Sequence, residues 1–83
     1  MKLKYTTSEG EDVSHAMAHV ASDKNAELLK QLPVKAAGMA LIGLCCPNHL
    51  VGMDFINIQG DDSHIKVVFG TERCKDQIEA TFA

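Results

Sequence analysis

The sequence predicts a small α+β domain, a three-stranded and mainly antiparallel sheet with helices packed on one face. Two observations predict strands: residues 2–6 alternate polar and apolar side chains, and residues 50–69 are rich in β-branched and aromatic residues. A third predicts helices, because apolar residues recur at intervals of three, four or a multiple of these from residue 13 to residue 32, with an interruption at Lys24. With 83 residues, 46% of them hydrophobic, we expect one domain over residues 1–83.

The first strand is expected over residues 2–6, with Leu3 and Tyr5 on one face. Ser8 and Glu11 then have the spacing of a capping box, which predicts a helix from about residue 9. This helix either runs on to residue 32 or is followed by a second one capped at Ser22 and Asp23. Both alternatives stay open.

Residues 34–46 are apolar almost throughout, and their alanine content favours a buried helix after Pro33. A buried strand from Met39 to Cys45 is the competing interpretation, because periodicity cannot separate the two. Residues 50–58 and 64–69 then predict a β-hairpin closed by a turn at residues 59–62.

A final helix is expected after Gly70 and Thr71, because Cys74, Ile78 and Phe82 follow at intervals of four. The predicted order is therefore β-α(α)-α-β-β-α.

The charge pattern points away from nucleic acid and membranes. Net charge is −3, and the eight Lys and Arg residues are dispersed along the sequence, whereas nucleic-acid-binding proteins gather them on one face. The longest apolar run, residues 36–46, is well short of the roughly 20 residues that span a bilayer. Three cysteines make a disulfide framework improbable, so we expect a reduced, cytoplasmic protein.

One group of residues has the chemistry of a metal or thiol site. Cys46 and His49 have C-x-x-H spacing, and His64 and Cys74 could complete a Cys2His2 set for zinc. Alternatively, Cys45 or Cys46 could be a reactive thiol beside His49. The competing interpretation is that both cysteines are small hydrophobes at the end of a buried element.

A second group lies on the first expected helix. Asp12, His15, His19 and Asp23 recur at intervals of three or four and would share one helical face. Such a face could chelate a divalent ion or respond to pH, although a solvated polar face explains the same pattern.

The expected function is a small non-enzymatic module that binds another protein, such as a regulatory or inhibitory accessory protein of bacterial or phage type. No motif for catalysis or for a nucleotide cofactor is present. With no Trp and one Tyr, the core is built from aliphatic residues, and a homodimer is expected as a way to extend it. The partner surfaces would be the open edge of the hairpin and the acidic, histidine-bearing helix face. The alternative is a metal-binding or reactive-thiol protein using Cys45, Cys46 and His49.

Overall fold

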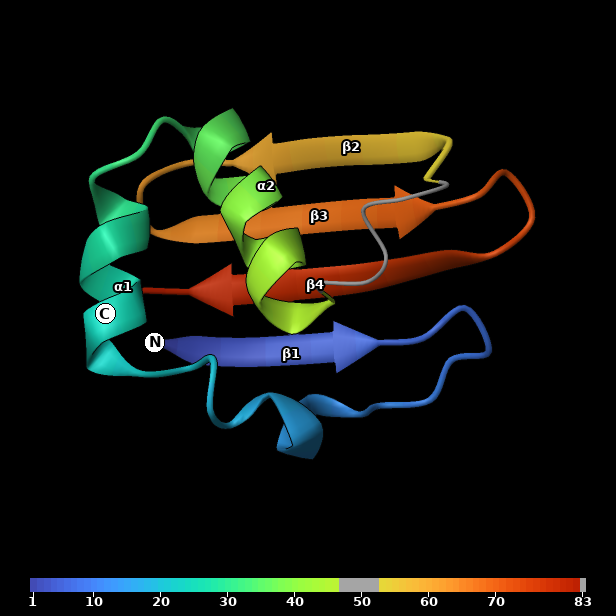
Figure 1. The fold of residues 1–83 in the computed structure, drawn as a ribbon, viewed down its shortest axis with the longest axis horizontal. Coiled ribbons are helices and arrows are strands. Elements are labelled where there is room, and N and C mark those ends of the chain that lie inside the picture. The colour runs from blue at the N-terminus through green and yellow to red at the C-terminus, as the bar shows by residue number, and fades with distance from the viewer. Residues whose placement is uncertain (47–52, 83) are drawn as a thin grey trace.

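A computed structural model describes residues 1–46 and 53–82 (Figure 1). It confirms the α+β class, with two α-helices over one face of an antiparallel sheet. The elements are, in chain order, β1 (Lys2–Thr6), the 3₁₀ turn η1 (Ser14–Met17), α1 (Asp23–Lys30), α2 (Val34–Cys45), β2 (Phe55–Gly60), β3 (His64–Gly70) and β4 (Lys75–Thr81).

The sheet has four strands in the order β1-β4-β3-β2, and each neighbouring pair is antiparallel. The expectation of three strands and of a final helix was wrong, because Lys75–Thr81 form β4 between β1 and β3 (Figure 1). An interval of four residues fits a strand as well as a helix, since every even interval returns to the same face of a sheet. Ile78 and Ala80 are fully buried on the face that the helices cover.

The hairpin of β2 and β3 is confirmed, but its turn is shorter than predicted, because Gln59 and Gly60 belong to β2 and the turn lies at residues 61–63. β2 begins at Phe55, after Met53 and Asp54, which are not part of the strand; the expected residues 50–52 lie outside the described residues. The Asp61 amide donates to the His64 carbonyl across the turn. Gly60 has a φ of +128°, and a Cβ there would collide with the same carbonyl, so the turn requires glycine.

Of the two alternatives for residues 9–32, a helix capped by Ser22 is the one that forms. The Ser22 hydroxyl accepts a hydrogen bond from the Asn25 amide at 3.2 Å, and α1 ends at Lys30. The next helix, α2, is confirmed over Val34–Cys45, so the strand alternative from Met39 was wrong. Among the described helices, none is long and apolar enough to cross a bilayer.

The helix expected from residue 9 does not form. Hydrogen bonds within residues 7–11 close a turn that brings Asp12 back beside Thr6, where the two form an isolated β-bridge. The Asp12 carboxylate then accepts hydrogen bonds from the amide and the hydroxyl of Ser14. These local bonds compete with a helical backbone, and only the short η1 turn follows.

The core lies between the helices and the sheet. Phe69 is 1% exposed and meets the ring of Tyr5 edge to face, with centroids 6.1 Å apart. Gly38 of α2 approaches β2 so closely that an added Cβ would lie 2.6 Å from Ile58 Cγ2. The buried aliphatic residues around them are Leu29, Leu41, Ile42, Ile65, Val67 and Ile78.

Candidate functional site

The structure does not bring the described members of the Cys2His2 set together. Cys46 is buried at the end of α2, His64 is the first residue of β3, and Cys74 is exposed in the turn before β4. His64 and Cys74 are at opposite ends of β3, whose seven residues span about 20 Å. His49 lies outside the described residues. In the ranges 1–46 and 53–82, no group of three or more His, Cys, Asp or Glu residues could hold a metal ion.

The two adjacent thiols are held in their protonated forms. Burial, and secondarily the neighbouring Cys46, raises the pKa of Cys45 to about 12. Burial also raises the pKa of Cys46; Asp76 reinforces this effect, and the hydrogen bond between Cys46 and Tyr5 opposes it. Metal binding and nucleophilic attack both use the thiolate, so this environment disfavours both. All three cysteines are free.

A polar cluster at the end of α2 was not found from the sequence. The Tyr5 hydroxyl donates to Asp76 Oδ2 at 2.6 Å and lies 3.1 Å from Cys46 Sγ. The other carboxylate oxygen of Asp76 accepts from the Ser8 amide at 2.9 Å. Burial, followed by the hydrogen bonds to Asp76 and Cys46, raises the pKa of Tyr5 far above its ordinary value. No sequence signal could identify this cluster, because it depends on β4 lying beside β1.

The four residues assigned to a helical face do not share one. Asp12 precedes η1, His15 lies within η1, and His19 is in the turn that follows. Asp23 is the first residue of α1. The hydrogen bonds from the side chain and backbone of Ser14 lower the pKa of Asp12, which is thereby a turn-forming residue.

An apolar groove lies on the outer side of the helices, between α1 and α2. Its volume is about 540 Å³. Leu28 and Leu32 line it from the α1 side and Leu44 from α2, and these side chains are 53%, 42% and 40% exposed. Ala40 and Gly43 of α2 also line it. Exposed leucines gathered in one hollow are typical of a surface that another molecule covers.

A second hollow of about 450 Å³ lies on the other side of α2, against the edge strand β2. Met39 and Ile56 line it and are 41% and 40% exposed. The two hollows flank α2, so apolar side chains extend from α1 across α2 to the sheet edge. We call this region the apolar helical surface, defined by Leu28, Leu32, Met39, Leu44 and Ile56.

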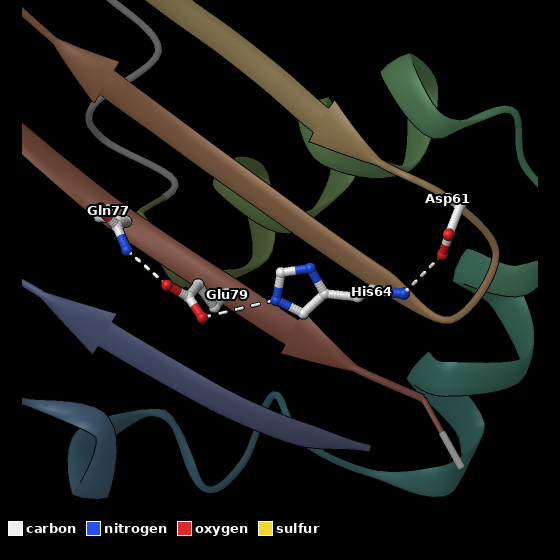
Figure 2. A network of polar contacts seen from close by, with 4 residues as sticks. All are labelled: Asp61, His64, Gln77 and Glu79. Atoms are coloured by element: carbon white, nitrogen blue, oxygen red, sulfur yellow. Dashed lines mark hydrogen bonds and ion pairs between the residues drawn. The ribbon is translucent and has the colours of Figure 1, made fainter.

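The opposite face of the sheet carries a polar network (Figure 2). Gln77 donates to Glu79 at 2.6 Å, and His64 Nε2 lies 3.5 Å from the other oxygen of the same carboxylate. The His64 amide donates to Asp61. Hydrogen bonds from Ser63, and then the one from His64, lower the pKa of Asp61. This network fixes the carboxylate of Glu79 on β4, in the middle of the sheet.

The geometry thus presents two uncovered surfaces, one apolar and one polar, and a thiol cluster that keeps its protons. Comparisons of the chain with family models, with curated proteins and with solved structures find no match.

Proposed function

We propose that this protein is a non-enzymatic protein-binding module that acts as a homodimer through its apolar helical surface. The observation that carries the proposal is the character of α2. This helix holds one charged residue, Lys35, yet only the side formed by Ala37, Gly38, Leu41 and Ile42 is buried against the sheet. A helix that is apolar on all sides is normally buried on all sides, so we expect a partner to cover the outer side of α2.

A second copy of the chain fits this surface. The outermost part of α2 carries small side chains at Ala36, Ala40 and Gly43, and a Cβ added at Gly43 would meet nothing within 4 Å. Two α2 helices related by a two-fold axis could therefore approach closely. The leucines flanking one α2 would lie over the groove of the other copy.

The energetics are compatible with a dimer. Burying the exposed half of a leucine contributes about 1 kcal/mol, and two-fold symmetry counts each contact twice. The five side chains of the surface then supply roughly 10 kcal/mol before the cost of association, which is of similar order. A dimer of modest affinity is expected.

The proposed role is that of a regulatory or inhibitory accessory protein, of the bacterial or phage type, in the reducing cytoplasm. Three free cysteines support a reducing compartment. The protonated state of Cys45 and Cys46 supports a binding role over a catalytic one.

Sedimentation over a range of concentrations tests the dimer. Leu28→Glu should convert it to a monomer, because a carboxylate would be buried in the interface twice. Gln59→Glu is the matched control, since it adds the same charge at an exposed position of β2 away from the helices. The proposal is wrong if the unaltered protein stays monomeric at a concentration of about 100 μM, which is well above the dissociation constant expected for a dimer of modest affinity. It is also wrong if both variants dissociate equally.

A further inference from the structure

The face of the sheet turned away from the helices is basic, although the whole chain is acidic. In β3 the buried residues Ile65, Val67 and Phe69 point toward the helices, so the alternate residues point the other way. The strand register extends this alternation to the whole sheet. The side chains on this open sheet face include four lysines, Lys2, Lys4, Lys66 and Lys75.

These lysines are half of the chain's eight cationic residues, in a protein whose net charge is −3. Within the four strands, one carboxylate lies on that face, Glu79, which Gln77 and His64 hold from either side (Figure 2). A second carboxylate, that of Asp12 beside β1, lines the same hollow as Lys2 and Lys4. In the described part of the chain, Lys2, Lys4 and Lys66 form no salt bridge.

The lysines have a regular spacing. Lys2 and Lys4 are two residues apart on β1, which corresponds to about 7 Å along the strand. Lys4, Glu79 and Lys66 form one row across β1, β4 and β3, so the two amines start from backbones about 10 Å apart. An extended peptide with acidic residues at alternate positions repeats its carboxylates at the same 7 Å interval.

We propose that the open sheet face binds an acidic, extended segment of a partner protein. The inference rests on the proposed protein-binding function but not on the dimer, which uses the other side of the molecule. Charge complementarity provides the recognition, as the ammonium groups of Lys2, Lys4 and Lys66 pair with the carboxylates of the segment. The amides of Asn57 and Gln59 lie on the same face and add hydrogen-bonding groups.

Single-stranded nucleic acid, the other polyanion to consider, fits this face less well. Stacking platforms for bases use several aromatic rings. The strands of this face offer Phe55, whose ring already lies beneath Lys75, with the amine 4.7 Å from its centroid. The single Arg of the chain, Arg73, lies in the turn before β4 and not on the face.

Fluorescence anisotropy with a labelled octaglutamate peptide at low salt tests the inference. The variant Lys4→Gln with Lys66→Gln should weaken binding about tenfold or more, as expected when two charge contacts are lost. The control Lys24→Gln with Lys35→Gln changes the net charge equally but on the exposed surfaces of α1 and α2. It should change the affinity less than twofold.

A variant that is expected to strengthen peptide binding, and not to weaken it, keeps the test independent of any loss of folding. Glu79→Gln removes the carboxylate between Lys4 and Lys66 and should tighten peptide binding several-fold, whereas Glu27→Gln on α1 should not. Equal effects of the test and control variants would overturn the inference, since net charge alone would then govern binding. Absence of peptide binding at low salt, or tighter binding of an oligothymidylate of equal charge, would also overturn it. Sedimentation of the same variants reports separately on the dimer.

Discussion

The Tyr5 hydroxyl should resist ionisation until the protein unfolds. Burial and the hydrogen bonds to Asp76 and Cys46 raise its pKa in the folded state, so the neutral phenol favours folding. This contribution is complete below the unfolded-state pKa of about 10 and is lost as the pH rises above it. The free energy of unfolding should therefore fall by about 1.4 kcal/mol per pH unit beyond pH 10 from Tyr5 alone. Ionisation of the buried thiols in the unfolded state steepens the fall.

A chain with one Tyr and no Trp makes this titration easy to read. Tyrosinate absorbance and far-UV circular dichroism, followed together during an alkaline titration, should change in one step. Tyr5→Phe should lower the free energy of unfolding at neutral pH by about 1–2 kcal/mol, since a hydrogen bond to a carboxylate is lost. Above pH 10, the free energy of unfolding of this variant should fall less steeply with pH, because one titrating proton has been removed. A tyrosinate signal with a midpoint near pH 10 in a fully folded protein would refute the reasoning.

Four further predictions concern α2, the cysteines and metal binding. Gly43→Ala should raise the free energy of unfolding of the monomer by up to about 1 kcal/mol, because alanine favours helix and nothing lies within 4 Å of the new Cβ. Gly38→Ala should lower the free energy of unfolding by about 1–2 kcal/mol, because the new Cβ would collide with Ile58. Chemical denaturation measures both changes, and a change of the same sign in the two variants would contradict the packing described for α2. A thiol reagent should label Cys74 much faster than the two thiols at the end of α2, as mass spectrometry would show; uniform labelling would disprove their protection. The melting temperature should not respond to a chelator, and a clear drop would instead support the zinc hypothesis.

The sequence predicted those elements whose signals are local. β1, the β2–β3 hairpin and α2 follow from alternation, turn residues and composition, and the Ser22 cap marks the start of α1. Residues 9–21 were mispredicted because the side chain of Asp12 bonds to Ser14 and replaces a helical turn.

The errors about β4 and the sites arise from long-range pairing. Ile78 and Ala80 are buried on either side of the less buried Glu79, as in a strand, but the interval of four from Cys74 to Ile78 and on to Phe82 also suits a helix. Because β4 was not recognised, neither the Tyr5–Asp76 contact nor the gathering of lysines on one face could be predicted. Cations that are dispersed along a sequence can still share a face when the strands that carry them are neighbours.

The position of β4 in the middle of the sheet also has a kinetic consequence. Ribosomal synthesis delivers β1 first and β4 last, yet β1 pairs only with β4 in the described sheet. α2, β2 and β3 are close in sequence and can assemble into a nucleus early. β1 joins the sheet only when Tyr5 pairs with Ile78, and this contact closes a loop that includes most of the chain. Docking of the two terminal strands is then expected to limit the folding rate, and substitutions in β4 should slow folding more than those in α1.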